Sequence, residues 1–294
     1  MAQSSRKTGT ITVWVGVICG LILIAVKILL GIIGKSHALI ADAFHSISDF
    51  LTDILAFFGV LYAFKGEDKD HPFGHGKIDT LMSLLIGIVM VLTGIWLGYE
   101  AVMNIITGDL ATPNIWALMG AVISILVKEA LFRYTHHVGI KISNQSLIAN
   151  AYHHRSDVLS SLAVVVGVIP AVINPDWAVF DALAAIVVAG MIAKMGFEVV
   201  IPAFRHASDA APSDEQIEEI KRVAASVEGA RNPHDIKARF YSNKLYTEVH
   251  IAVDPNITVQ KGHEIADMVR DKIMAEIDDI LGVIVHVDPD DENN

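Results

Sequence analysis

Six long apolar segments constrain the fold of this chain more than any other sequence feature. They cover residues 10–34, 38–64, 78–106, 114–135, 146–173 and 177–202. Each is long enough to cross the hydrocarbon core of a bilayer, about 30 Å thick, as an α-helix. Because 53% of all residues are hydrophobic, the pattern predicts an all-α membrane domain of six transmembrane helices, and it excludes an ordinary soluble protein.

The loops between these segments differ in their content of basic residues. On one predicted side of the membrane lie Arg6, Lys7, Lys65, Lys69, Lys77, Arg133, Lys141 and Arg205, and on the other side only Lys35. Cytoplasmic loops are enriched in Lys and Arg. We therefore expect a multi-pass protein of the inner (cytoplasmic) membrane with both termini in the cytoplasm.

The composition changes after the sixth segment. Over residues 210–294, eighteen Asp or Glu oppose nine Lys or Arg, so most of the net charge of −11 lies there. An acidic surface attracts cations and argues against a nucleic-acid partner. The sequence predicts a transmembrane transport domain at residues 1–208 and a soluble cytoplasmic domain at residues 209–294.

Local signals in the second domain predict a small α+β fold. Ser213 and Gln216 match a capping box, and Thr258 is a second candidate helix cap. The predicted elements are a helix at 213–228, strands at 234–241 and 245–253 joined by a turn at 242–244, a helix at 258–277 and a strand at 282–287. This α-β-β-α-β order favours an open sheet with two helices on one face.

Two His-x-x-x-Asp pairs lie inside the second and fifth apolar segments. His45 precedes Asp49, and His153 precedes Asp157, each by about one helical turn, so both side chains of a pair share a helix face. A carboxylate at the centre of a bilayer costs roughly 2.5–3.5 kcal/mol on insertion scales. If the two helices pack side by side, two imidazoles and two carboxylates converge into a divalent-metal site.

A structural role is the alternative for these pairs, because polar side chains also join membrane helices by hydrogen bonds. The occurrence of the same pair twice favours the metal site. Asp42, three residues before His45, is expected to orient the imidazole ring. Five other charged residues of the apolar segments are expected to snorkel or to lie near span ends: Lys27, Lys128, Glu129, Lys194 and Glu198.

Two further groups of His and Asp lie outside the apolar segments. Asp68, His71 and His75 occupy a loop with Pro and Gly, which is either a small surface metal site or a solvated polar loop. The second domain contains His234, His250, His263, His286 and Asp288. His286 and Asp288 are two residues apart in a predicted strand and so face the same side. This group either holds one or two metal ions or consists of scattered surface histidines.

Motifs that would indicate an enzyme are incomplete or absent. His263-Glu264 begins the H-E-x-x-H zinc pattern, but Asp267 replaces its second His. The sequence has neither a phosphate-binding P-loop nor a G-x-S-x-G nucleophile motif. We expect no enzymatic activity. The alternative is an intramembrane metalloenzyme, for which Asp53, one turn after Asp49, is the available extra carboxylate.

Together these motifs resemble those of the cation diffusion facilitator family over nearly the whole chain. The matching residues are Ala41-Asp42-x-x-His45-Ser46-x-x-Asp49, His71-Pro72-Phe73-Gly74-His75-Gly76-Lys77, Arg133-Tyr134, the run 143–157 and the histidines of the second domain. The resemblance implies a homodimer of six-helix protomers with metallochaperone-like cytoplasmic domains. It also implies export of Zn²⁺ or a similar ion against inward proton flow.

The resemblance assigns residues to four sites. It implies a transport site at His45, Asp49, His153 and Asp157, and a loop site at Asp68, His71 and His75. It implies a binuclear site that helps the dimer form at His234, His250, His263, His286 and Asp288. It also implies an ion pair between Lys77 and an acid after the sixth helix, here Asp209.

The ligand types favour one ion and one mechanism. Two nitrogen and two oxygen ligands suit tetrahedral Zn²⁺ better than Mg²⁺ or Ca²⁺, which prefer more oxygens. Because metal binds deprotonated ligands and releases protons, we hypothesise Zn²⁺/H⁺ antiport, with Zn²⁺ also as a structural ion. The alternatives are Fe²⁺, Mn²⁺, Co²⁺ or Cd²⁺ transport through the same site, and a metal-sensing scaffold that assembles through its second domain.

Overall fold

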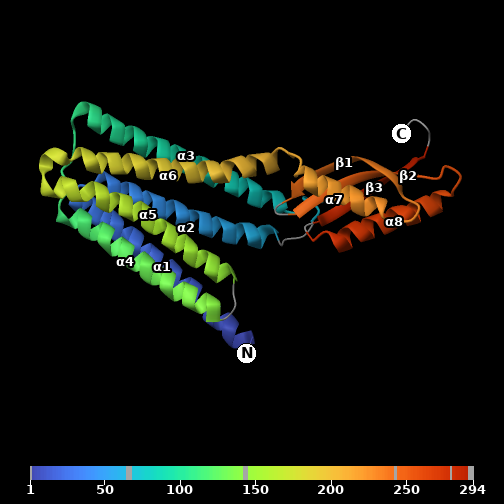
Figure 1. The fold of residues 1–294 in the computed structure, drawn as a ribbon, viewed down its shortest axis with the longest axis horizontal. Helices are drawn as coiled ribbons and strands as arrows, with labels where there is room; N and C mark the ends of the chain where they lie inside the picture. Colours follow the sequence, from blue (N-terminus) through green and yellow to red (C-terminus); the bar gives the residue numbers. More distant parts are fainter. Residues whose placement is uncertain (1, 64–67, 142–144, 242–243, 279, 291–294) are drawn as a thin grey trace. The chain divides into compact units, whose positions relative to one another are not determined.

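The computed structural model describes residues 2–63, 68–141, 145–241, 244–278 and 280–290 (Figure 1). Its long helices are α1 (Ala2–Gly34), α2 (His37–Ala63), α3 (Gly76–Thr107), α4 (Ile115–Lys141), α5 (Gln145–Ile173) and α6 (Val179–Ala207). A 3₁₀ turn, η1 (Pro175–Trp177), precedes α6. Each long helix covers one of the six predicted apolar segments, apart from one or two end residues of the second, fourth and sixth segments. The predicted fold class is confirmed.

Length and composition make most of these helices suitable for crossing a membrane. Among the described residues, α1, α3, α4, α5 and α6 meet this condition. The remaining long helix, α2, has 27 residues, as many as α4. At 1.5 Å per residue it spans about 40 Å, which exceeds the hydrocarbon core. α6 continues five residues beyond Pro202, where the sequence pattern had placed its end; proline is tolerated within transmembrane helices.

The chain forms two compact units. One unit consists of residues 1–55 and 85–200, and the other of residues 56–84 and 201–294. The second unit thus includes the end of α2, the loop after it and the start of α3. The predicted domain division between residues 208 and 209 stays a prediction.

Small residues allow the helices of the first unit to pack closely. A Cβ atom on Gly94 of α3 would lie 2.7 Å from the backbone nitrogen of Ala193 in α6. A Cβ on Gly34 of α1 would lie 2.5 Å from the backbone nitrogen of Ala117 in α4. Close approach of backbones through Gly and Ala is the usual way in which membrane helices gain packing energy. These contacts hold α3 against α6 and α1 against α4.

A buried carboxylate of α6 holds the first turn of α2. Asp181 accepts hydrogen bonds from Ser36 Oγ at 2.5 Å and from the backbone N–H of His37 at 2.8 Å. The first N–H groups of a helix have no partner within the helix, and a carboxylate also complements the positive end of the helix dipole. Asp181 therefore positions the helix that carries the first His-x-x-x-Asp pair.

The second unit contains a three-stranded sheet with two helices. The strands β1 (Arg231–Tyr241) and β2 (Lys244–Val253) are antiparallel, and β3 (Ile280–Pro289) runs parallel to β2 in the order β1-β2-β3. The helices are α7 (Asp214–Ala225) and α8 (Val259–Glu276). The predicted α-β-β-α-β order is confirmed. Residues 242–243 of the predicted turn lie outside the described residues.

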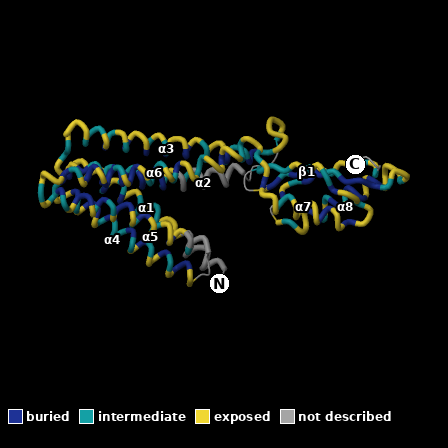
Figure 2. The backbone as a smooth tube through the Cα atoms, turned by 45° about the horizontal axis from the view of Figure 1, so that its top comes forward, coloured by how far each residue is buried: buried dark blue, intermediate teal, exposed yellow. Residues whose placement is uncertain are grey.

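The sheet domain has its own hydrophobic core. Buried residues of α7 and α8, such as Ile220, Val269 and Ile273, pack against Val249 and Ile251 of the central strand. Both helices contact each other and the sheet, and Figure 2 shows them on the same face. The predicted capping box at α7 and the predicted Thr258 cap at α8 are both present. The opposite face of the sheet is therefore left available for its polar residues.

Candidate metal centres

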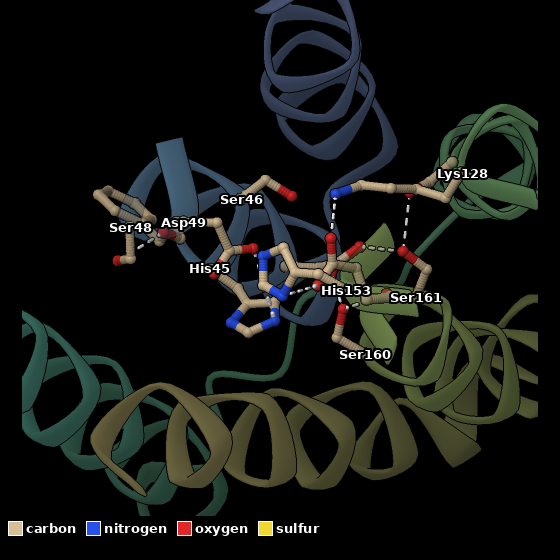
Figure 3. Close-up of polar contacts among 12 residues, drawn as sticks. His45, Ser46, Ser48, Asp49, Lys128, His153, Ser160 and Ser161 are labelled. Carbon is tan, nitrogen blue, oxygen red and sulfur yellow. Dashed lines mark hydrogen bonds and ion pairs between the residues drawn. The ribbon is translucent and has the colours of Figure 1, made fainter. Parts of the chain in front are cut away.

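Three side chains of the intramembrane pairs converge between α2 and α5. The ligand atoms of His45, Asp49 and Asp157 all lie within 4.8 Å of one another, and all three residues are buried. Figure 3 shows the side chains of His45 and Asp49 on α2. His45 Nε2 lies 3.9 Å from Asp49 Oδ2, as the spacing of one helical turn predicts. The grouping has the size and chemistry of a cation site.

Several polar atoms of this group have no hydrogen-bond partner. Among the described residues, both carboxylate oxygens of Asp49 and the Nδ1 atom of His45 are buried without one. Asp49 is 7% exposed and His45 only 2%. Burying an ionised carboxylate without a compensating partner costs several kcal/mol. A bound divalent cation would supply the missing interaction to the Asp49 carboxylate.

The fourth predicted ligand, His153, lies at the edge of this group. Its Nδ1 atom is 3.9 Å from Asp157 Oδ1, one turn away on α5, and its side chain is 42% exposed. It is not among the residues whose ligand atoms all lie within 4.8 Å. In Figure 3 its side chain is drawn beside that of His45. The structure thus brings three of the four predicted ligands together and places the fourth next to them.

Two lysines of the apolar segments are buried in ion pairs, so the prediction that they snorkel was wrong. Lys128 of α4 places Nζ 2.5 Å from Asp157 Oδ2, and Lys27 of α1 places Nζ 2.8 Å from Asp42 Oδ2. Both lysine side chains are at most 9% exposed. A lysine snorkels when its helix face meets lipid. Here Lys27 faces a carboxylate of α2 and Lys128 faces a carboxylate of α5, and these carboxylates hold the ammonium groups inside.

We predicted that Asp42 orients the ring of His45, but its carboxylate instead joins helices. Its oxygens accept hydrogen bonds from Ser160 and Ser161 of α5 at 2.7 and 2.8 Å, in addition to the contact with Lys27. Ser161 also bonds to Ser124 of α4 at 2.7 Å. These interactions link α1, α2, α4 and α5 behind the candidate metal ligands.

This supporting network was missed in the sequence, although parts of it had a signal. Ser160 and Ser161 follow Asp157 by about one turn and therefore lie near its helix face. Lys128 is central in an apolar segment, where an ionised group indicates a function or a partner. Asp53, the candidate base of an intramembrane enzyme, has a side chain outside the described residues.

The loop residues Asp68, His71 and His75 form a second group in the second unit. The two histidine rings have centroids 4.3 Å apart, and Asp68 lies 3.4 Å from a ring nitrogen of each. The backbone N–H of His71 also donates to Asp68 at 2.9 Å, which closes the turn. His75 is buried, whereas His71 is exposed. The structure therefore brings all three predicted loop ligands together.

A third group lies on the sheet of the second unit. His234 and His250 are cross-strand partners in β1 and β2, and His286 of β3 is the partner of His250 on its other side. Asp288 Oδ2 lies 3.1 Å from His250 Nδ1 and 3.5 Å from His234 Nε2. His286 Nε2 is 3.3 Å from the other Asp288 oxygen. Four of the five predicted ligands are therefore adjacent.

The fifth residue of this predicted set, His263, lies elsewhere. It is on α8, its side chain is 74% exposed, and its Nε2 atom is 3.5 Å from Asp267 one turn later. His234, His250 and Asp288 have ligand atoms within 4.8 Å of one another, and His263 does not belong to this group. Within one protomer, the structure thus separates His263 from the strand ligands.

The implied ion pair between Lys77 and an acid after α6 has a defined geometry. Lys77 Nζ lies 2.6 Å from Asp209 Oδ1, and Arg239 Nη1 is 3.4 Å from the other oxygen. The Lys77 hydrogen bond lowers the pKa of Asp209 below its ordinary value. Next to Lys77, the backbone N–H of Gly76 donates to the Tyr241 hydroxyl at 3.0 Å. These contacts join the start of α3 to β1 within the second unit.

The helical membrane fold and the buried group of His and Asp are the features expected of a membrane carrier of divalent metal cations. Residues 13–206 match the cation efflux transmembrane domain, and residues 212–290 match the cation efflux protein cytoplasmic domain. The chain therefore belongs to the cation diffusion facilitator family. Transport of divalent metal cations is the activity of this family, and the match of the cytoplasmic domain supports dimerisation.

Relatives with different names match most of the chain. An uncharacterized transporter of Methanocaldococcus jannaschii is 36% identical over 90% of this chain and 92% of its own length. The manganese efflux system protein MneP of Bacillus subtilis is 33% identical over 98% of this chain and 97% of its own. The magnetosome protein MamB of Magnetospira sp. is 34% identical over 90% and 89%. The relatives thus agree on the family but name no common ion.

Proposed function

We propose that this protein exports Zn²⁺ in exchange for protons through the group of ligands between α2 and α5. The observation that carries the proposal is the pair of unpartnered carboxylate oxygens on buried Asp49, next to the unpartnered Nδ1 of His45. A membrane domain does not gain stability from such atoms, because each costs desolvation energy without a hydrogen bond. A site that alternately binds and releases a cation needs them.

The ligand set selects the ion by its chemistry. With His153 turned toward Asp157, the site offers two imidazole nitrogens and two carboxylates. This set suits four-coordinate Zn²⁺, whereas Mg²⁺ and Ca²⁺ prefer six or more oxygens. Imidazole binds metal only in its neutral form. Protonation of His45 and His153 therefore releases the metal, which couples the two ion flows.

Mn²⁺ is the second candidate, because a relative that matches nearly the whole chain is named a manganese efflux protein. Mn²⁺ prefers oxygen ligands and more than four of them, so it would need water molecules in addition to Asp49 and Asp157. Fe²⁺, Co²⁺ and Cd²⁺ also fit nitrogen and oxygen ligands. Affinity follows the Irving–Williams order and does not reveal the physiological ion.

The remaining features complete the proposal. We propose a homodimer in the inner (cytoplasmic) membrane with both termini in the cytoplasm. In it, the loop group around Asp68 and the sheet group around Asp288 bind metal on the cytoplasmic side. A metal-sensing scaffold is a different proposal with its own supporting feature, since the sheet group alone could respond to metal. It differs in requiring the sheet ligands and not Asp49.

Metal-dependent proton flux in sealed vesicles tests the proposal. The purified protein is reconstituted with a pH-sensitive dye inside, and Zn²⁺, Mn²⁺, Fe²⁺ or Cd²⁺ is added outside in turn. We expect a saturable proton signal that is strongest with Zn²⁺ and absent in the variant His45→Ala/Asp157→Ala. A folded, dimeric protein that gives no signal with any ion would reject transport and favour the scaffold. A signal with Mn²⁺ alone would keep transport and reject Zn²⁺.

A further inference from the structure

A buried cation already contacts one of the proposed metal ligands. Lys128 of α4 lies with Nζ 2.5 Å from Asp157 Oδ2, and both side chains are less than one-tenth exposed. Figure 3 shows Lys128 extending from α4 toward the side chains of α2 and α5. Asp157 is also within 4.8 Å of the ligand atoms of His45 and Asp49. One carboxylate therefore belongs both to the metal group and to an ion pair.

If Lys128 and a metal ion both interact with the Asp157 carboxylate, the free energy of metal binding becomes less favourable. An ammonium group donates hydrogen bonds and has no lone pair to offer a metal. With Asp49 and Asp157 ionised, a divalent ion neutralises the two carboxylates fully. The positive charge of Lys128 then stays buried without a net negative charge beside it, which is costly. Bound metal and bound lysine therefore oppose each other.

The other buried lysine shows what a purely structural pair looks like here. Lys27 contacts Asp42 Oδ2 at 2.8 Å and donates to Ser46 Oγ at 2.9 Å. Asp42 is not in the group of candidate metal ligands, and both of its oxygens also accept bonds from the serines of α5. Lys27 thus neutralises a carboxylate that joins helices, whereas Lys128 neutralises one that is proposed to bind the cargo.

We propose that Lys128 is a tethered counter-cation that competes with the transported ion for Asp157 and so keeps metal binding weak enough for release. This inference rests on the proposed transport function of the same site. A carrier must bind its ion and also let it go. Lys128 stabilises Asp157 while the ion is away and lowers the net affinity when the ion arrives. It is a positioning residue, which acts on the cargo through Asp157.

The test compares two matched lysine substitutions. Lys128→Gln removes the charge but keeps an N–H donor for Asp157, and Lys27→Gln does the same for Asp42. Lys128→Arg keeps the charge. All are made in a full-length background carrying His71→Ala and His250→Ala, so that binding reports the α2–α5 site. Equilibrium Zn²⁺ and Mn²⁺ affinity is measured by competition with a chromophoric chelator, and thermal unfolding is measured with and without metal.

Opposite changes in affinity and stability are the expected signature. Lys128→Gln should bind metal roughly tenfold more tightly, within the range of typical coupling between two ligands. Without metal it should unfold at a lower temperature than the background protein, and metal should raise that temperature by a larger amount. Vesicle transport should become slower because release is slower. Lys27→Gln should lose thermal stability with unchanged affinity, and Lys128→Arg should keep the affinity of the background.

The outcomes separate this inference from the function on which it rests. If the background protein binds no divalent ion, the proposed function and the inference both fail. If it binds metal and Lys128→Gln binds with equal or lower affinity, the function stands and the counter-cation role is rejected. Identical behaviour of the two Gln variants would reject it as well. Should Lys128→Gln not fold without metal, both Gln variants are purified with metal and the rate at which the chelator removes it is measured. Slower removal from Lys128→Gln than from Lys27→Gln supports the proposal, and equal or faster removal rejects it.

Discussion

The ligand group between α2 and α5 and the group on the sheet contain the same residue types in different surroundings. His45, Asp49 and Asp157 are buried, and atoms of His45 and Asp49 lack hydrogen-bond partners among the described residues. In the sheet group, the side chains of His234, His250 and Asp288 are 20–25% exposed and contact one another. The second group is partly accessible to solvent and its members contact one another, whereas the first group is buried with polar atoms that lack partners.

Burial of the side chains, more than their residue types, therefore distinguishes the two sites. The buried group is destabilised without a bound cation, whereas the partly exposed group is not. A buried carboxylate without a partner is destabilising, so its retention indicates a function. A partly exposed His and Asp group is stable with or without metal. The buried group therefore suits transport, and the exposed group suits a response to metal concentration.

The largest expected effect is on transport, and it comes from the buried group. Asp49→Asn should abolish metal uptake by reconstituted vesicles, because it removes a charged ligand. Even groups that only orient a metal ligand change affinity by about 10–100-fold. Thermal stability should stay equal or rise, since Asp49 gives up no hydrogen bond from a described residue. Asp288→Asn is the matched control and should retain uptake at saturating metal. Uptake by Asp49→Asn at the wild-type rate would contradict the claim that the buried group, and not the sheet group, carries transport.

The next effect is on stability and separates Asp42 from the ligands. Asp42→Ala should lower the free energy of unfolding by about 3–5 kcal/mol, because it leaves Lys27 as an uncompensated buried charge. The double variant Lys27→Met/Asp42→Leu should recover most of that loss. Denaturant unfolding in detergent measures both. A double variant as unstable as Asp42→Ala would show that the pair is not the main role of Asp42.

Much of the scaffold could be predicted from the sequence, and the interior of the site could not. The apolar segments locate the helices because a membrane helix is a local property of about 20 residues. His45 with Asp49, and His153 with Asp157, share a face by spacing alone. The burial of Lys128 depends on which face of α4 meets α5, which no local pattern contains. The position of His263 could not be predicted either, because the local sequence does not indicate which face of its helix packs against the sheet.

A smaller effect is expected from the sheet group. His250→Ala should remove metal binding by this group, because His250 lies between His234 and His286 and contacts Asp288. Equilibrium dialysis of the full-length protein should show fewer bound Zn²⁺ ions per protomer. Transport at saturating metal should stay within about twofold of wild type. Loss of transport equal to that of Asp49→Asn would instead support the scaffold proposal.

The smallest effect is expected at the exposed ion pair of Lys77 and Asp209. The Asp209 side chain is 42% exposed, so solvent screening limits the contribution of the pair to about 1 kcal/mol or less. Because the hydrogen bond from Lys77 lowers the pKa of Asp209 in the folded protein, the pair stabilises the fold above about pH 4. That contribution is lost as the pH falls through the lowered pKa.

Thermal unfolding of Lys77→Ala and wild type at several pH values measures this contribution. The difference in unfolding temperature should be small at neutral pH and should vanish in acid. A difference that grows toward low pH would contradict the assigned sign.

X-ray absorption spectroscopy of bound Zn²⁺ tests the central claim most directly. The full-length protein would carry His71→Ala, His234→Ala and His250→Ala, so that the loop and sheet groups no longer bind metal. We predict one Zn²⁺ per protomer with four nitrogen or oxygen ligands at about 2.0–2.1 Å, including two imidazoles. This signal should be lost in the same protein with Asp49→Asn. Failure of the triple variant to bind Zn²⁺, or an unchanged spectrum after Asp49→Asn, would contradict the account.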